Sequence, residues 1–407
     1  MNTLKNFFTI QQFKISLIIS LCFSAFIYFF HFGFEFYLLN SLLGLYAFYL
    51  LIISDRKTLL LSGFFIGLLW FYWVGFSFQY YDIGWAIPFV SVGFALGFAL
   101  IFWLISWPSH PLLRALMLFL LSLLEPLDFN WLQPELLFLH SYFGIEKWQY
   151  ALILLALALF VYFREKRGYL FLLLLLLAFD FSTQPEHKLP LDVTLVQTTL
   201  RQDLKWNPYY IPGTIKNNFD AIDQAIKEKK ELIVLPESAF PLFLNHHSAL
   251  VQRLKEKSKN IAIITGSLYE EDRQNFNATY FFLDGKIQIA KKMVLVPFGE
   301  YIPLPSFLAK PINRAVFGGT SDYICATEPS DFIIKDVVLR NAICYEATCH
   351  ELFEGSPTAM VATSNNAWFM PSIEPSLQRL LMHFYARKNN TIILHAANGA
   401  GGGIIYP

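Results

Sequence analysis

The sequence predicts an N-terminal transmembrane α-helical bundle followed by a globular α/β domain. Charge is distributed very unevenly along the 407 residues, because only nine of the 31 Lys and Arg residues precede position 182. That first part consists largely of long apolar segments, which are typical of membrane helices. In the second part, short β-branched runs alternate with amphipathic helical segments, the pattern of an α/β domain. The formal net charge is zero, so the composition gives no sign of nucleic-acid binding.

The first part contains seven apolar segments of roughly 15–22 residues, close to the ~20 that a helix needs to cross the hydrocarbon core. They are 13–30, 36–53, 59–80, 85–107, 112–127, 148–163 and 168–181. We therefore expect residues 1–182 to form a transmembrane bundle of about seven helices. A cleavable signal peptide is not expected, because the first segment leads through a short turn into a second long apolar segment.

Loop charges orient these segments, because cytoplasmic loops carry an excess of Lys and Arg. With the N-terminus in the cytoplasm, eight basic residues fall on the cytoplasmic side: Lys5, Lys14, Arg56, Lys57, Arg114, Arg164, Lys166 and Arg167. The opposite side holds only Lys147. Seven crossings from this start carry the rest of the chain across the membrane. We therefore expect a multi-pass protein of the bacterial inner membrane, with a second domain, residues 190–407, in the periplasm.

The second domain follows a junction at 182–190 and shows a regular alternation of elements. Strands are predicted at 192–197, 231–238, 260–269, 278–296, 337–346, 359–365 and 391–398. Helices are predicted at 217–230, 247–260 and 375–390, with Lys and Arg toward their C-terminal ends. Asp284-Gly285, between two strand-like runs, indicates a hairpin.

Polar residues stand at the ends of three of these apolar strands. The run "LIVLPES" reaches Glu237, "IAKKMVLVPFGE" carries Lys292 and then Glu300, and "NAICYE" carries Cys344. If they converge, they form a complete set for acyl transfer. A thiol attacks a carbonyl, a carboxylate takes and returns the proton, and an ammonium stabilises the oxyanion.

Three motifs in this order carry a resemblance to a known family: "LPES", "KKMVLVPFGEYIP" and "CYE". They resemble the Glu-Lys-Cys signature of the nitrilase (carbon–nitrogen hydrolase) superfamily. Together with the N-terminal bundle, "LKWNP", "NFNATYFF" and "SNNAWF", they resemble the apolipoprotein N-acyltransferase family more narrowly. The resemblance covers essentially the whole chain and implies a nitrilase-like αββα sandwich for the second domain.

The resemblance also implies roles for individual residues. Glu237 matches the general base, Lys292 the oxyanion-stabilising lysine and Cys344 the nucleophile. Lys291 is the rival to Lys292, and the spacing to "PFGE" favours Lys292. Two roles stay open for Glu300, which is either a proton-transferring carboxylate or an ion-pair partner that orients the lysine.

Four further residues are implied around this set. Tyr345 and Glu346 would line the site behind the cysteine. Trp206 and Trp368 match aromatic residues on mobile arms near the substrate entrance, and the alternative for both is a place in the core. A structural alternative also remains for the nucleophile, since a free cysteine is often a small buried hydrophobe.

By this resemblance the protein is an N-acyltransferase. Its acyl donor would be a membrane phospholipid, and its acceptor the α-amine of the diacylglyceryl-modified N-terminal cysteine of an apolipoprotein. We expect a monomer embedded in the lipid bilayer, with no cofactor, no metal and no nucleic acid. Two other functions stay open: a membrane-tethered nitrilase-type amidase, in which water replaces the amine, and a catalytically silent membrane receptor or transporter.

Some positions depart from the family pattern. Val294 stands where Arg or His is usual, Asn366 and Met370 replace Asp and Gly, and His350 replaces Pro. The family continues through further strands and a last transmembrane helix beyond "NGAGGGIIYP", so we expect this C-terminal part of the pattern to be absent. The cysteines show no metal-ligand spacing and no dense disulfide pattern. Cys22 lies within the first apolar segment, and Cys325 and Cys349 are expected to be inert.

Overall fold

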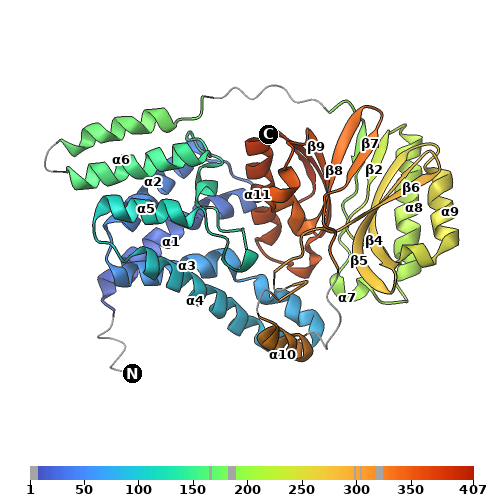
Figure 1. Cartoon of the computed structure of the whole chain (residues 1–407), viewed down its shortest axis with the longest axis horizontal. Helices are drawn as coiled ribbons and strands as arrows, with labels where there is room; N and C mark the ends of the chain where they lie inside the picture. The colour runs from blue at the N-terminus through green and yellow to red at the C-terminus, as the bar shows by residue number, and fades with distance from the viewer. Residues whose placement is uncertain (1–7, 165–166, 182–188, 298, 303–304, 317–323) are drawn as a thin grey trace. The chain divides into compact units, whose positions relative to one another are not determined.

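A computed structural model describes residues 8–164, 167–181, 189–297, 299–302, 305–316 and 324–407 of the chain (Figure 1). It divides into two compact units. The first unit comprises Met1–Pro126 and Asn130–Thr183, and the second comprises Leu127–Phe129 and Gln184–Pro407. Most of the predicted junction at 182–190 lies outside the described residues, as do Lys5 and Lys166.

The first unit is helical at every predicted apolar segment. Its α-helices are α1 (Ile10–His31), α2 (Tyr37–Ile53), α3 (Arg56–Phe71), α4 (Ile87–Ile105), α5 (Pro111–Leu121) and α6 (Lys147–Tyr162). Its 3-10 helices are η2 (Val74–Tyr81), η3 (Gly84–Ala86), η5 (Pro134–Phe138) and η6 (Gly168–Ala178). The 3-10 helix η4 (Pro126–Asp128) has its first residue in this unit and the other two in the second.

These helices differ in their capacity to cross a bilayer. Among the described residues, Ile10–His31 and Gly84–Ile105 are long and apolar enough, and α3 with η2 forms a third span if the 52° bend between them is accepted. The remaining apolar helices α2, α5, α6 and η6 have 10–17 residues. The unit is therefore an apolar helical bundle, and the seven crossings remain a prediction.

Small residues allow close helix packing in this unit. A Cβ atom on Gly63 would lie 2.5 Å from the carbonyl oxygen of Phe98, and one on Gly67 would lie 2.8 Å from the Phe98 Cβ. Only glycine therefore permits α3 and α4 to approach this closely at these positions. Glycine and other small residues at helix contacts are typical of membrane helices, whose association depends on close van der Waals packing.

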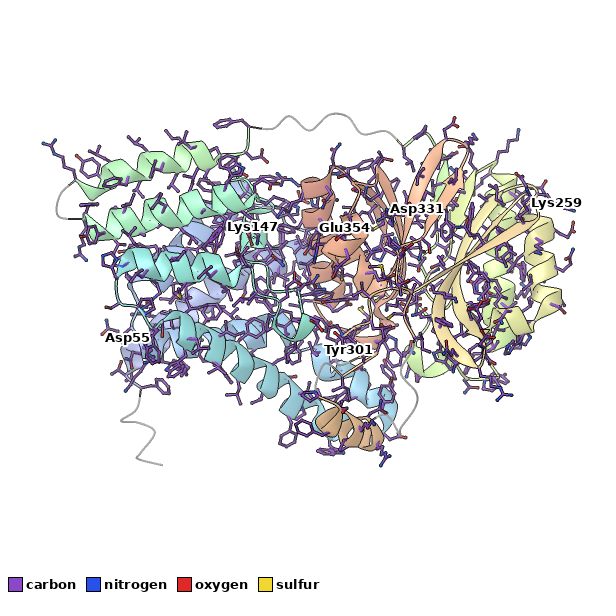
Figure 2. The ribbon with its side chains drawn as sticks, in the orientation of Figure 1. Asp55, Lys147, Lys259, Tyr301, Asp331 and Glu354 are labelled. Carbon is purple, nitrogen blue, oxygen red and sulfur yellow. The ribbon has the colours of Figure 1, made fainter. Side chains whose placement is uncertain are left out.

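The second unit is built on two sheets. The first contains β1 (Val193–Leu195), β2 (Leu232–Val234), β4 (Ala262–Glu271), β5 (Gln274–Leu283) and β6 (Lys286–Lys291) in this order, and β3 (Phe240–Phe243) pairs with β4. The second has the order β11 (Gly403–Ile405), β10 (Ile392–Asn398), β9 (Ala359–Asn365), β8 (Val337–Ile343) and β7 (Asp331–Ile334). Strands β1, β2 and β4 are parallel, as are β8, β9 and β10. At the outer strand β7, Asp331 (labelled in Figure 2) pairs with Arg340 of β8 at 2.5 Å.

Two apolar layers hold this unit together. Val234 and Ile264 of the first sheet share one buried cluster with Val361 and Leu394 of the second, so the two sheets pack face to face. On the other side of the first sheet, α8 (Ile211–Lys227) and α9 (Ser248–Lys257) form a second cluster. Helix α11 (Glu374–Asn389) lies outside the second sheet (Figure 1). The predicted α/β domain is confirmed, and its layers are those of an αββα sandwich.

The hairpin prediction is confirmed, but the strand after it is shorter than predicted. Asp284 and Gly285 have φ angles of 51° and 75°, as the tight turn between β5 and β6 requires. Strand β6 ends at Lys291 instead of continuing to position 296. The N–H of Lys292 still donates to the carbonyl of Asn277 in β5, but those of Met293 and Val294 donate to the carboxylate of Glu346 and not to a strand.

Other differences concern short or irregular elements. Helix α8 starts at Ile211, before the predicted 217. The strands β3, β7 and β11 and the helices α7 (Gln202–Lys205) and α10 (Ser306–Val316) were not predicted. Most of these elements are only three or four residues long, which leaves too little periodicity in the sequence to detect them.

Candidate active site

Cys344 occupies a strained turn at the end of β8. It directly follows Ile343, the last residue of the strand, and begins a short 3-10 helix, η8 (Cys344–Thr348). Its φ angle is 58°, a left-handed conformation that is uncommon for a residue with a side chain. Strained residues of this kind cluster at active sites, and the turn presents the partly buried thiol beyond the strand.

Glu237 lies beyond the end of β2 and is held from both sides. Its carboxylate Oε1 accepts a hydrogen bond from Asn277 Nδ2 at 2.7 Å, and its main-chain carbonyl accepts one from Lys205 Nζ at 2.8 Å. The next residue, Ser238, has a φ angle of 48°. Gly266 lies directly behind this turn, because a Cβ atom there would come within 2.6 Å of the Glu237 Cα. The turn that carries this carboxylate is thus fixed in position.

The structure separates the two neighbouring lysines. The Lys292 side chain is 1% exposed, and its Nζ lies 2.6 Å from Glu300 Oε2. Lys291 lies on the other face, where it is 26% exposed, pairs with Glu271 and contacts the ring of Phe276. Consecutive residues of an extended strand point to opposite faces, so only one of the two can enter the site. That residue is Lys292.

Charges around Lys292 keep it protonated. Burial by itself would lower its pKa, but Glu300, Glu237, Cys344 and Glu346 outweigh it and raise the pKa above its usual value. Glu300 also accepts from the N–H of Val296 at 2.8 Å, which ties it to its own loop. In this structure Glu300 is therefore an ion-pair partner of the lysine.

Burial raises the pKa of the Cys344 thiol well above its usual value. The charge of Glu237 raises it further, Lys292 opposes the shift, and Glu374 and Glu300 add to it. The structure thus brings the three residues of the predicted set together, close enough for their charges to act on one another. The resting thiol is neutral at pH 7, so its attack on a carbonyl requires a base.

Glu346 connects the two chain segments that carry the lysine and the thiol. Its buried carboxylate accepts from the N–H groups of Met293 and Val294, which follow Lys292, and from that of Ile343, which precedes Cys344. Burial raises its pKa to about 7. Tyr345 is also buried at 4% exposure, behind the thiol in the same turn. Both residues are thus buried in the turn that carries the thiol, and their supporting role stays a prediction.

Helix α11 adds a contact to the thiol that the sequence did not indicate. Gln378 is fully buried, and its Nε2 lies 3.8 Å from Cys344 Sγ. Its Oε1 accepts from Asn366 Nδ2 at 2.9 Å. Glu374, on the same helix, is 2% exposed, and burial raises its pKa well above the usual value. A periodic pattern predicted the helix, but nothing in it marked these polar residues among the apolar ones.

The two tryptophans predicted to contact the substrate differ from each other in burial. Trp206 directly follows Lys205 and is 39% exposed, so it is not a core residue. Trp368 is partly buried and is the last residue of the 3-10 helix η10 (Asn366–Trp368). The first residue of this helix, Asn366, donates a hydrogen bond to Gln378. Their contact with a substrate stays a prediction.

The remaining cysteines are free thiols. Cys349 is buried and its Sγ donates to the carbonyl of Tyr345, whereas Cys325 is exposed. Within the described ranges, no group of three His, Cys, Asp or Glu side chains suits a metal ion.

The described part of the chain combines an apolar helical bundle with an αββα sandwich in which a thiol lies at a strand end. Residues 10–181 match the family model described as "Apolipoprotein N-acyltransferase integral membrane domain". The protein named "Apolipoprotein N-acyltransferase" from Wolinella succinogenes is 45% identical over 396 residues, 97% of this chain and 95% of that relative. Its counterpart from Helicobacter pylori is 37% identical over 91% of this chain and 88% of the relative. The chain belongs to the apolipoprotein N-acyltransferase family.

Solved structures add less. That of a CN-hydrolase superfamily protein from Xanthomonas campestris aligns with 15% identity and a TM-score of 0.38, over 51% of this chain and 76% of that chain. A similarity of this size carries no conclusion about function, and the description of the fold rests on the two sheets and their helices.

Proposed function

We propose that the protein transfers an acyl chain from a membrane phospholipid to the α-amine of a diacylglyceryl-modified N-terminal cysteine, through a thioester on Cys344. The catalytic residues are Glu237, Lys292 and Cys344, with Glu300, Tyr345 and Glu346 in support. The observation that carries the proposal is that the charges of Glu237 and Lys292, at the ends of β2 and β6, act on the partly buried thiol of Cys344 at the end of β8. Membership of the family supplies the choice of donor and acceptor.

In the first step, Cys344 attacks the carbonyl carbon of an acyl ester of the phospholipid. Glu237 takes the thiol proton as the sulfur–carbon bond forms, which avoids a free thiolate in a site that disfavours it. The negative charge on the carbonyl oxygen is stabilised by Lys292. When the intermediate collapses, the carbon–oxygen bond breaks, Glu237 returns the proton to the leaving glycerol oxygen, and a lysophospholipid departs.

In the second step, the neutral α-amine of the acceptor attacks the thioester. Glu237 accepts the amine proton, and Lys292 again stabilises the oxyanion. Collapse breaks the carbon–sulfur bond, releases the amide and returns the proton to the Cys344 sulfur. Because both substrates are anchored in the bilayer, a membrane-embedded enzyme meets them by diffusion in two dimensions.

The thioester is the intermediate to detect. Purified protein incubated with phospholipid and no acceptor is expected to gain the mass of one acyl group, and hydroxylamine should remove it. A peptide with a free, diacylglyceryl-modified N-terminal cysteine should discharge the adduct to an amide, and the same peptide with a blocked amine should not. Rapid loss of the adduct to water without any acceptor would instead favour the amidase alternative.

We further propose that the protein is a multi-pass inner-membrane protein, acting as a monomer, with residues 190–407 in the periplasm. The support is the bias of basic residues toward one side of the predicted segments. A phosphatase reporter fused after position 182 is expected to be active, whereas a reporter that works only in the cytoplasm should be silent. The reverse pattern would contradict the orientation.

A further inference from the structure

A cavity with both polar and apolar lining lies in the second unit next to Glu237. It has a volume of about 410 Å³ and is lined by the chain after β1, by α7 and α8, and by the turn after β2. A phosphate and its ester substituents fit comfortably within this volume, which is in the usual range for small-ligand pockets. The function proposed above assigns no role to this cavity.

A buried lysine forms part of its wall. Lys205 is 2% exposed, and its Nζ donates to the main-chain carbonyl of Glu237 at 2.8 Å. Among the described residues, no carboxylate lies within ion-pair distance of it. An ammonium group has three N–H donors, and burying it is costly unless they are used. A neutral side chain could donate one hydrogen bond to this carbonyl at a lower desolvation cost. The hydrogen bond to Glu237 therefore does not explain why a charged group is buried here.

The chain around Lys205 is held rigidly. Asn398 accepts from the N–H of Leu200 at 2.9 Å and donates to its carbonyl at 2.8 Å. Asn365 donates to the side chain of Gln202 at 2.8 Å. These buried amide side chains hold the segment at Leu200 and Gln202 and so position Lys205 in the cavity wall.

The cation lies within electrostatic reach of Glu237. Burial lowers the pKa of Lys205 to about 8, and the charge of Glu237 opposes that shift. The group is therefore mostly protonated at pH 7, and a bound anion would stabilise the charged form.

Hydroxyl and amide groups in the same cavity have unused hydrogen-bonding capacity. The side chains of Ser238, Thr199 and Asn217 line it, and none of them bonds to another described residue. Ser238 is buried at 6% exposure. Together with Lys205, these donors come from four separate chain segments. Such a set suits a ligand with several acceptor oxygens around one centre, as a phosphate group has.

We propose that this cavity is a phosphate subsite in which Lys205 and Ser238 bind the anionic headgroup phosphate of the acyl donor. The inference rests on the proposed function. It means that the phospholipid donor is recognised in the cavity beside Glu237, the proposed general base. Binding the phosphate here would hold the neighbouring glycerol ester near Cys344.

The test compares two donors with identical acyl chains, dipalmitoyl phosphatidylethanolamine and dipalmitoylglycerol, in the same detergent. Lys205→Gln removes the charge and retains a donor for the Glu237 carbonyl. We expect it to raise the KM for the phospholipid at least tenfold, since a charge-assisted hydrogen bond is lost. The rate with dipalmitoylglycerol should change less than twofold. Ser238→Ala should act in the same direction but more weakly, and Lys291→Gln, on the exposed face, should change neither donor.

The pH dependence gives a second readout. The KM for the phospholipid should rise as pH increases through about 8, because Lys205 loses its proton. The KM for dipalmitoylglycerol should lack this rise, and so should the phospholipid KM of Lys205→Gln. An equal loss of rate with both donors in Lys205→Gln would show that the lysine only supports Glu237, and would overturn the subsite.

Inorganic phosphate distinguishes a headgroup from a free anion. If it inhibits the wild type but not Lys205→Gln while both proteins use the two donors equally well, the cavity binds free phosphate and the headgroup assignment is wrong. If the proposed acyltransferase function is wrong, neither donor acylates Cys344 in the wild type. Equal, efficient acylation by both donors would contradict only the subsite.

Discussion

The two units bury most of their polar side chains in different ways. In the first unit, several buried side chains bond to main-chain carbonyls: Ser16 to Thr58 at 2.9 Å and Ser20 to Ser62 at 3.1 Å. The buried carboxylate of Glu135, which pairs with Lys147, is an exception. Arg114 is 3% exposed, and all its hydrogen bonds also go to main-chain carbonyls. The serine bonds and the Arg114 bonds to Leu51 and Ser54 join segments that are distant in the sequence, and none of these carbonyl acceptors can titrate.

In the second unit, the buried polar groups at the strand ends interact with one another. Lys292 pairs with Glu300, and the charges of Glu237 and Lys292 act on Cys344. A change of protonation at one group therefore changes the others. The difference between the units separates structural polar groups from functional ones, because strongly perturbed, mutually coupled groups are typical of active sites.

The largest effect that this contrast predicts is at the nucleophile. Cys344→Ala is expected to reduce acyl transfer to a lipopeptide on the order of 10⁴-fold or more, since the covalent route is lost. Cys344→Ser should also lose turnover, because a hydroxyl is far less acidic than a thiol. Cys325→Ser and Cys349→Ser serve as controls and should retain both the acyl adduct and transfer. Undiminished transfer in Cys344→Ala would refute the mechanism.

The next largest effect separates the two lysines. Lys292→Ala is expected to lower the rate about 10²–10³-fold, the usual result of losing an oxyanion-stabilising group. Lys291→Ala should have a small effect, because its side chain pairs with Glu271 on the exposed face. Transfer rates of the two variants at saturating donor measure this directly. The opposite ranking would show that the wrong lysine has been assigned.

A smaller effect concerns the pKa of the thiol. Glu237 raises the pKa of Cys344, so removing its charge in Glu237→Gln should lower that pKa. More thiolate is then present at pH 7, and iodoacetamide should label Cys344 faster, about tenfold for each pKa unit. Acyl transfer should nevertheless fall, because the base is gone. Mass spectrometry of labelled peptides against pH, with exposed Cys325 as internal reference, follows both cysteines. Slower labelling in Glu237→Gln would contradict the electrostatic coupling.

The smallest effect belongs to the first unit. Ser20→Ala removes the hydroxyl that bonds to the carbonyl of Ser16 in its own helix and to that of Ser62 in α3. Loss of the bond between the helices is expected to cost about 0.6 kcal/mol of stability, the average for such bonds between membrane helices. Catalysis should be unchanged. Thermal unfolding in detergent, with a parallel transfer assay, measures both. A loss of activity without a loss of stability would mean that the first unit also contributes to the chemistry.

Local patterns in the sequence were sufficient to predict most helices and strands and the polar residues at the strand ends. Apolar length located the six α-helices of the first unit but not η5, and the alternation of runs located most strands of the second. The hairpin at Asp284-Gly285 and the strand-end positions of Glu237, Lys292 and Cys344 could all be predicted. These features depend on neighbouring residues, whose periodicity and turn preferences act over a few positions.

Only the tertiary structure decided which side chains complete the site. Lys205 and Asn277 bond to Glu237, and Gln378 contacts Cys344, each from an element far away in the chain. Glu346 accepts from an N–H group some fifty residues before it, just after the end of β6. Nothing local distinguishes a lysine that will be buried from one that will be solvated. Its environment is set by the packing of segments that meet only when both sheets have formed, and burial and charge then determine what each group can do.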